Sequence, residues 1–213
     1  MVSRSRKLLF ALVPLAALLL TACAQDAGHA GMDHEGPMAP MRSVEEARVS
    51  PNAGVMSTVG TTNVMVHYGR PSLRGREVFG DGSELAPRGQ VWRTGANEAP
   101  TFTTSGDLVV EGQTLPAGTY GLFTIPGDEW TVIFSQNARQ WGAFRYADAE
   151  DQLRVTVEPM TGAPMQEQFE IRFEDVNEEE ATMVMHWGTV GVPVVIAEAA
   201  GADADREMDE DDM

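Results

Sequence analysis

The chain has 213 residues, enough for one domain of ordinary size once its ends are set aside. It carries 32 Asp and Glu against 15 Lys and Arg, a formal net charge of −17. So acidic a surface disfavours nucleic acid and anionic bilayer surfaces as partners, because both would repel it. The single cysteine excludes a disulfide bond within one chain.

Residues 1–22 are typical of a secretory signal, with three basic residues near the start and an apolar run over residues 8–20. The string Leu20-Thr-Ala-Cys23 resembles a bacterial lipobox, in which the cysteine becomes the lipidated first residue of the mature chain. We therefore expect a cell-envelope protein that touches the membrane only through acyl chains on Cys23. No aspartate follows this cysteine, which favours the outer membrane, with the domain in the periplasm or at the cell surface.

Residues 23–47 are predicted to be a flexible tether, because no apolar period of 2 or 3.6 persists in them. Imidazoles and thioethers gather in this tether and could hold copper, since thioether suits Cu(I) and imidazole suits copper or zinc. The candidate ligands are His29, Met32, His34, Met38 and Met41. The alternative is a plain spacer, since a short disordered run has no preformed site. Residues 199–213 are predicted to be an acidic, disordered tail.

Residues 48–198 show short alternating runs separated by turn signals and no long helical period. The pattern predicts an all-β domain, an antiparallel β-sandwich or a barrel-like fold of about nine to ten short strands. The runs with strand signals are 55–59, 63–68, 91–94, 101–104, 108–110, 119–125, 130–135, 153–158, 168–173, 182–187 and 192–196. We expect Trp130 and Trp187 to be core residues, since each buries a large area.

Several strings in this domain resemble the DUF2911 family of uncharacterised bacterial exported proteins. They are Tyr68-Gly-Arg-Pro71, Arg74-Gly-Arg76, Val91-Trp-Arg-Thr-Gly-Ala-Asn-Glu98, Pro116-Ala-Gly-Thr-Tyr120 and Phe123-Thr-Ile-Pro126. The resemblance covers about residues 48–197 and implies a fold and export, but no activity. Residues 81–84 look like an insertion relative to the family.

Five of the 12 arginines that follow the signal lie between Arg70 and Glu98. Arginine grips carboxylate or phosphate with two parallel hydrogen bonds, so this segment predicts a site for a small anionic or polar ligand. Amide, carboxylate and indole groups would complete it. The candidate residues are Arg70, Arg74, Arg76, Trp92, Arg93, Asn97 and Glu98. Alternatively, the arginines pair with Glu77, Glu84, Glu98 and backbone carbonyls and hold a long loop in place.

Two histidines offer a catalytic alternative. His67 and His186 lie on expected strands, and if both met Glu98 they could form an acid/base pair or a two-histidine metal site. The usual role of a histidine on a strand is structural. The sequence has no nucleophile elbow, zincin motif, phosphate-cradling loop or dinucleotide fingerprint, which favours a non-catalytic protein.

Overall fold

The computed structural model describes residues 48–199. This part of the chain is all β, with a single turn of 3-10 helix, η1 (Asp148–Glu150). Its strands are β1 (Asn52–Val59), β2 (Thr62–Gly69), β3 (Phe79–Gly80), β4 (Ala86–Pro87), β5 (Thr101–Thr104), β6 (Leu108–Val110), β7 (Gln113–Leu115), β8 (Gly118–Ile125), β9 (Trp130–Ser135), β10 (Asp151–Val157), β11 (Met160–Glu174) and β12 (Glu180–Glu198). Among the described residues, no helix has the length and apolarity that a membrane span requires.

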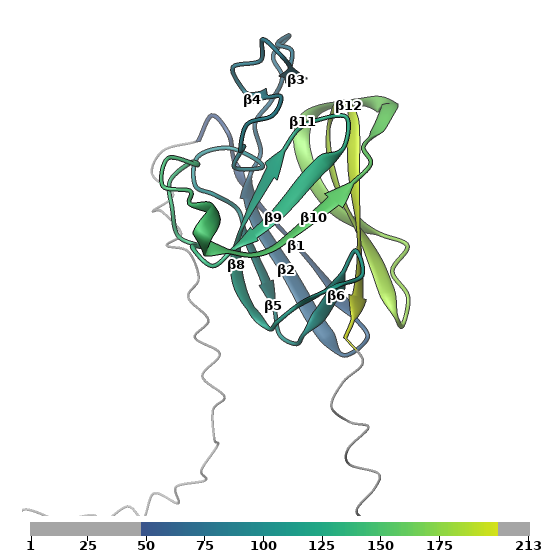
Figure 1. The fold of residues 1–213 in the computed structure, drawn as a ribbon. Helices are drawn as coiled ribbons and strands as arrows, with labels where there is room; N and C mark the ends of the chain where they lie inside the picture. Colours follow the sequence, from purple (N-terminus) through teal and green to yellow (C-terminus); the bar gives the residue numbers. More distant parts are fainter. Residues whose placement is uncertain (1–47, 200–213) are drawn as a thin grey trace, which may run out of the picture. The chain divides into compact units, whose positions relative to one another are not determined.

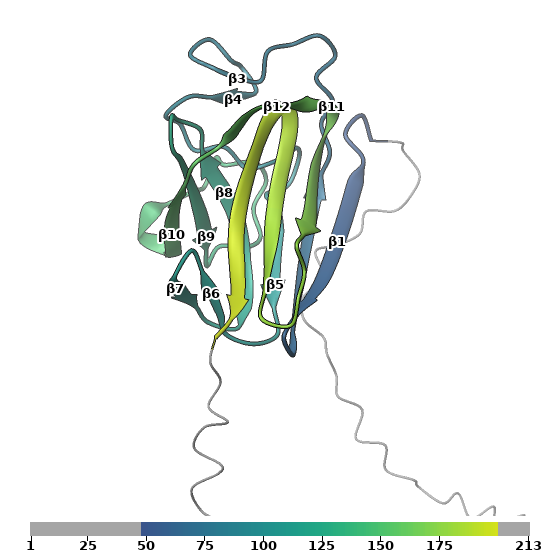
Figure 2. The ribbon, with the colours of Figure 1, turned by 90° about the vertical axis from the view of Figure 1, so that its right-hand side faces the viewer.

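Two antiparallel sheets face each other and make a sandwich (Figures 1 and 2). One has six strands in the order β1-β2-β5-β8-β9-β10, and the other has four in the order β11-β12-β6-β7. The short β3 and β4 form a separate parallel pair inside the long segment that follows β2. The expected fold class is therefore confirmed, and it takes the form of a sandwich.

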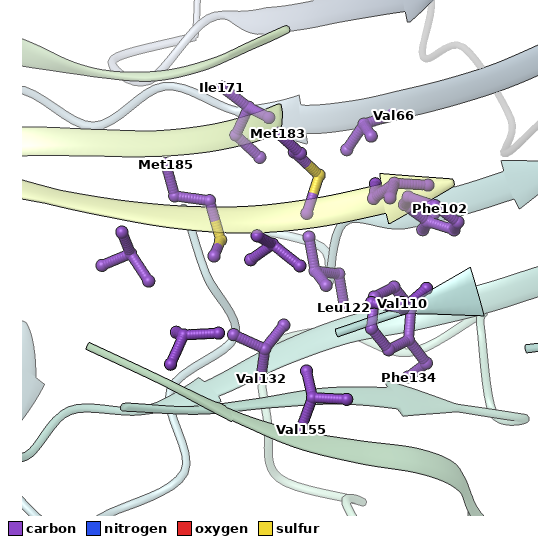
Figure 3. Close-up of a cluster of buried hydrophobic side chains, with 14 of the residues drawn as sticks. Val66, Phe102, Val110, Leu122, Val132, Phe134, Val155, Ile171, Met183 and Met185 are labelled. Atoms are coloured by element: carbon purple, nitrogen blue, oxygen red, sulfur yellow. The ribbon is translucent and has the colours of Figure 1, made fainter. Parts of the chain in front are cut away.

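The core lies between the two sheets, because strand alternation sends every second side chain inward. Along β2, for example, Val64 and Val66 are fully buried while Met65 between them is only partly so. Figure 3 shows Leu122 of the six-stranded sheet facing Met183 of the four-stranded sheet. Burial of these side chains is the main force that holds the two sheets together.

A second, smaller apolar cluster lies outside this core. Phe123 of β8 and Ile133 of β9 are fully buried and pack with Ala99, Ala143 and Tyr146. Phe123 and Ile133 alternate with core residues, so they belong to the outer face of the six-stranded sheet. The segment between β9 and β10 thus covers that outer face.

The structure corrects the expected strands in three places. The segment 91–94 is not a strand; only Trp92 forms an isolated bridge, to Thr124, and Thr94 has a left-handed φ of 49°. The runs 182–187 and 192–196 belong to one 19-residue strand, β12. The strand continues through Gly188, which has a φ of 62° and pairs with Gln166 of β11. The register between the two strands shifts on both sides of this pair, and the shift accommodates the unusual conformation. Finally, β3, β4 and β7 are too short, at two or three residues, to show an alternating pattern.

Candidate functional site

A pocket of about 530 Å³ lies where the segment after β2 meets the segment before β5. It is lined by Val49, Ser50, Pro71, Ser72, Arg74, Arg76, Leu85, Trp92, Arg93, Gly95, Ala96, Asn97 and Trp187. Five of the seven residues that the sequence suggested for a ligand site thus meet around one cavity, namely Arg74, Arg76, Trp92, Arg93 and Asn97. None of the lining residues, all within the described part of the chain, is acidic.

A tight turn presents Arg74 and Arg76 at this pocket. The Arg76 backbone N–H donates to the Leu73 carbonyl at 3.0 Å, and the two residues between them have left-handed φ angles, 52° at Arg74 and 73° at Gly75. Gly75 adopts that conformation without steric cost. Arg74 is held in it by a hydrogen bond from its backbone N–H to the Glu167 side chain at 2.9 Å. Leu73 is buried and anchors the turn to the core.

The guanidinium of Arg76 is oriented by its own loop. Its Nε donates to the Leu73 carbonyl at 3.0 Å and its Nη2 to the Ser72 carbonyl at 2.9 Å. Backbone carbonyls carry only partial negative charge, so the cation keeps its full charge at the pocket. Arg74 and Arg76 are both exposed and form the rim.

The opposite wall is the segment Trp92–Asn97, whose backbone is strained. Thr94 is fully buried at φ 49°, a conformation that is an outlier for a β-branched residue, and its Oγ1 donates to Thr124 Oγ1 at 3.1 Å. Gly95 has φ 148°, and Asn97 has φ 67° with its Nδ2 donating to the Ser50 carbonyl at 3.2 Å. Residues held in such regions tend to cluster at binding sites, where the surrounding structure fixes them.

Trp92 joins this wall to the core. It is almost fully buried and stacks on Trp187 of β12, with ring centroids 5.8 Å apart and planes 16° from parallel. Its N–H and carbonyl both pair with Thr124 of β8, at 2.8 and 2.9 Å. Ring stacking and backbone hydrogen bonds therefore hold this wall firmly against the core. The burial of Trp130 and Trp187 confirms that both are core residues.

Arg93 is the least compensated charge at the pocket. Its side chain is half-buried, and its Nε is completely buried with no hydrogen-bond partner among residues 48–199. Desolvation by the surrounding protein lowers the pKa of Arg93 below its usual range. No carboxylate of the described residues pairs with Arg74, Arg76 or Arg93. The pocket therefore holds three cations without a protein counter-ion in that part of the chain.

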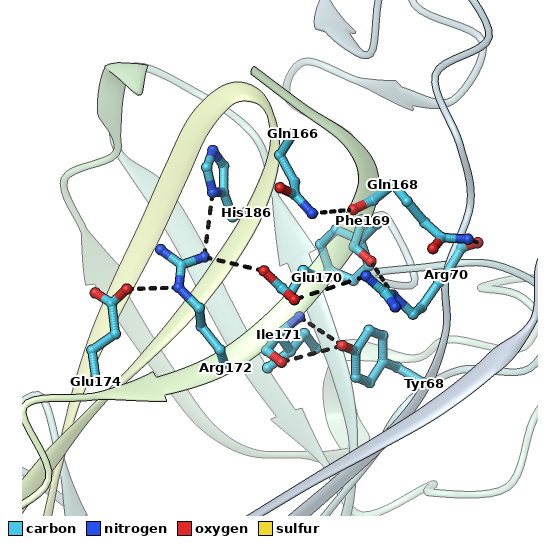
Figure 4. A network of polar contacts seen from close by, with 10 residues as sticks. All are labelled: Tyr68, Arg70, Gln166, Gln168, Phe169, Glu170, Ile171, Arg172, Glu174 and His186. Carbon is cyan, nitrogen blue, oxygen red and sulfur yellow. Dashed lines mark hydrogen bonds and ion pairs between the residues drawn. The ribbon is translucent and has the colours of Figure 1, made fainter. Parts of the chain in front are cut away.

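The other two candidates, Arg70 and Glu98, lie outside the pocket and tie segments together. Arg70 Nε donates to the Phe169 carbonyl at 3.0 Å, and its Nη2 lies 3.8 Å from Glu170 Oε1 (Figure 4). Glu98 accepts two hydrogen bonds from Arg48, at 2.8 and 2.9 Å. Arg70 and Glu98 thus fit the structural-tie interpretation, and so do the bonds of Arg76 to backbone carbonyls of its own loop, whereas the anion-site interpretation stays a prediction for the residues at the pocket.

The two histidines do not meet. His67 follows the core residue Val66 along β2, so it points out of the six-stranded sheet. His186 follows the core residue Met185 along β12 and points out of the four-stranded sheet, on the other side of the sandwich. The structure therefore does not bring His67, His186 and Glu98 into one site.

His186 instead belongs to a polar network on the outer face of β11 and β12 (Figure 4). Its Nδ1 lies 3.3 Å from Arg172 Nη1, and Arg172 Nε donates to Glu174 at 2.6 Å. Arg172 also lies 3.8 Å from Glu170, which is shared with Arg70. These alternating positive and negative side chains link Arg70, just after β2, to the outer face of the four-stranded sheet.

The remaining candidates fall outside residues 48–199. Cys23 and the tether residues His29, Met32, His34, Met38 and Met41 all precede Arg48. Within the described residues, no group of three or more His, Cys, Asp or Glu side chains is placed to hold a metal ion. The copper prediction therefore rests on the tether sequence.

Sequence reasoning missed part of the pocket. Val49 and Ser50 lie just before β1, and Leu85 lies in the long segment that includes β3 and β4. Trp187 was expected only as a core residue, yet it also lines the cavity. Val49, Ser50 and Leu85 belong to no motif that indicates ligand binding, and the strand pattern around Trp187 indicates a core residue, so the sequence alone did not assign them to a ligand site.

The family comparison covers nearly all of the sandwich. A family model described as "Protein of unknown function (DUF2911)" matches residues 50–196, well over half of the chain. The chain belongs to the DUF2911 family. Every pocket residue except Val49 lies inside the matched range, so the pocket is built within the DUF2911 domain itself. Comparison with curated proteins and with solved structures returned no match.

Proposed function

We propose that this DUF2911 protein is a lipid-anchored cell-envelope protein whose β domain binds a small anionic or polar ligand without converting it. The observation that carries the proposal is Arg93, a half-buried cation at a pocket with no acidic lining residue among those described. An uncompensated charge in a partly dry site is unfavourable, and a bound anion would offset that cost.

The dimensions of the pocket support this proposal. Its volume of about 530 Å³ falls in the range of about 300–1,000 Å³ that small-molecule sites occupy. A second cavity, about 230 Å³ in volume, also has an arginine at its wall, Arg88. That arginine pairs with Asp128 at 2.6 Å, so it has a counter-ion that Arg93 lacks within residues 48–199.

The cellular address is part of the proposal and rests on the sequence. The signal over residues 1–22 and the lipobox cysteine, Cys23, support attachment to the membrane through acyl chains, most simply at the outer membrane. The ligand would then be a solute of the periplasm or of the cell surface.

Titration with small anions tests the binding proposal. We expect the backbone amide NMR signals of residues 92–97 to shift saturably on addition of acetate, inorganic phosphate or 3-phenylpropionate. Arg93→Glu should weaken this binding by more than about tenfold, because it replaces a charge-assisted bidentate partner with a repulsive one. Arg145→Glu, which makes the same charge change at an exposed residue outside the pocket, should leave it unchanged.

The outcome that contradicts the proposal is equal binding by the wild type and Arg93→Glu, or no saturable shift with any of the three anions. Because a buried glutamate could disturb folding, Arg74→Glu provides a second test at an exposed rim residue. Its β-sheet amide signals should match those of the wild type while its anion affinity falls.

Metal handling by the tether is the alternative function, favoured by the spacing of His29, Met32, His34, Met38 and Met41. Copper ligation there predicts that a Cu(I) titration of the full chain detects a site that is lost from a chain beginning at Arg42. Equal copper affinity in both proteins would remove this alternative.

A further inference from the structure

The pocket has two chemically different parts. Its half-buried part holds the Arg93 guanidinium, whose Nε is buried with no hydrogen-bond acceptor among residues 48–199. Its open part is the rim made by the exposed Arg74 and Arg76. The lining of the pocket also includes the apolar residues Pro71, Leu85 and Trp92.

The Arg93 guanidinium also defines the geometry of the anion. An arginine binds a carboxylate most favourably through two parallel N–H bonds, and the edge formed by its two terminal nitrogens is one such fork. The Nε atom is fully buried, so a ligand in the cavity cannot reach it, whereas the terminal nitrogens of this pocket-lining side chain are not buried in this way. A planar pair of oxygens fits the edge that these two nitrogens form.

The rest of the cavity indicates that the anion is part of a larger molecule. A bare inorganic ion would leave most of the 530 Å³ filled with water against Leu85, Pro71 and the edge of Trp92. Covering apolar surface is favourable roughly in proportion to its area. A ligand that joins an apolar body to the anionic group would use both parts of the site.

We infer that the ligand of this pocket is an organic carboxylate with a compact apolar body, its carboxylate on Arg93 and its body against Pro71, Leu85 and Trp92. This inference rests on the proposed binding function and deepens it. Arg74 and Arg76 would then attract the anion to a protein whose overall charge is strongly negative, and they could receive a second anionic group at the rim.

The test compares four probes on the full chain by calorimetric or NMR titration. These are 3-phenylpropionate, its neutral amide 3-phenylpropanamide, acetate and inorganic phosphate. We expect 3-phenylpropionate to bind at least about tenfold more tightly than acetate or phosphate, because only it covers the apolar wall. It should also exceed the neutral amide by at least about tenfold, because only the acid pairs with Arg93.

Two variants assign these preferences to residues. Arg93→Gln should abolish the preference for the acid over its amide, whereas Arg145→Gln should keep it. Leu85→Ser should reduce the preference for 3-phenylpropionate over acetate and leave acetate binding unchanged.

The possible failures are distinguishable. If none of the charged probes binds saturably, the proposed function fails and this inference fails with it. If phosphate or acetate binds as tightly as 3-phenylpropionate, or the amide binds as tightly as the acid, the site remains an anion or polar-ligand site but the assignment to an apolar carboxylate is overturned.

Discussion

At the scale of single residues, the wall of the pocket combines two features that cost stability. Arg93 holds a charge away from water without a counter-ion among residues 48–199. Beside it, Thr94 is held at φ 49° and Asn97 at φ 67°. Each such conformation costs on the order of 1 to 3 kcal/mol. An unpaired charge and unfavourable backbone conformations at the same cavity are typical of a functional site, where residues are kept for binding and not for stability.

A prediction at this scale concerns Tyr146, whose side chain is part of the outer apolar cluster. Burial, the largest cause, raises the pKa of Tyr146 to about 12, and its hydrogen bond to Asp151 adds to the rise. Since the folded state favours the neutral phenol, stability from this residue is complete below the unfolded pKa of about 10 and is lost as pH rises towards 12.

The measurement is the unfolding midpoint in urea between about pH 9 and pH 12. We expect the wild type to lose more stability over this range than Tyr146→Phe, which has no ionisable group there. Parallel curves for the two proteins would show that Tyr146 ionises equally easily in the folded and unfolded states.

At the scale of elements, the pocket wall depends on a close contact between β2 and the segment Trp92–Asn97. The Ala96 N–H donates to the Gly69 carbonyl at 3.3 Å. A Cβ added at Gly69 would lie only 2.2 Å from the Ala96 carbonyl oxygen. Glycine is therefore required at this position by the approach of the two backbones, and the pocket keeps its shape because they touch.

Gly69→Ala should accordingly lower the free energy of unfolding by roughly 1–3 kcal/mol, because a backbone atom cannot move aside as a flexible side chain would. Gly82→Ala is the matched control, since its Cβ would meet nothing within 4 Å. Urea denaturation of both variants measures the difference. Similar stabilities would mean that the segment Trp92–Asn97 shifts without cost, and the rigid wall described above would not exist.

The sequence predicted strands such as β2 and β10 because apolar and polar residues alternate along them, as their burial does. It could not separate the arginines at the pocket from those that act as ties, because the deciding partners are remote in sequence. Arg70 meets the carbonyl of Phe169, 99 residues away, while Arg93 meets no acceptor in the described chain. Residues 91–94 have the composition of a strand. In the structure, hydrogen bonds of Trp92 and Thr94 to Thr124, and of Ala96 to Gly69, instead shape residues 92–97 into the wall of the pocket.

At the scale of the whole molecule, the site is a product of sandwich closure. Trp187 comes from the four-stranded sheet, whereas Trp92 and Arg93 lead into β5 of the six-stranded sheet. The two indoles stack across the core and bring the walls together. Although the chain has a net charge of −17, it concentrates positive charge at one cavity. The local electrostatic potential there would attract an anion despite the acidity of the whole protein.

The central claim is that Arg93 serves a ligand and not the fold. Its most direct test is the melting temperature of the wild type and of Arg93→Met, each without ligand and with saturating 3-phenylpropionate. Without ligand we expect the variant to melt at the same temperature or higher, because an apolar side chain of similar length removes a desolvated charge. Ligand should raise the midpoint of the wild type only. A variant that melts more than about 4 °C lower, beyond what 1 kcal/mol produces in a domain of this size, would show that Arg93 holds the fold together and would contradict the claim.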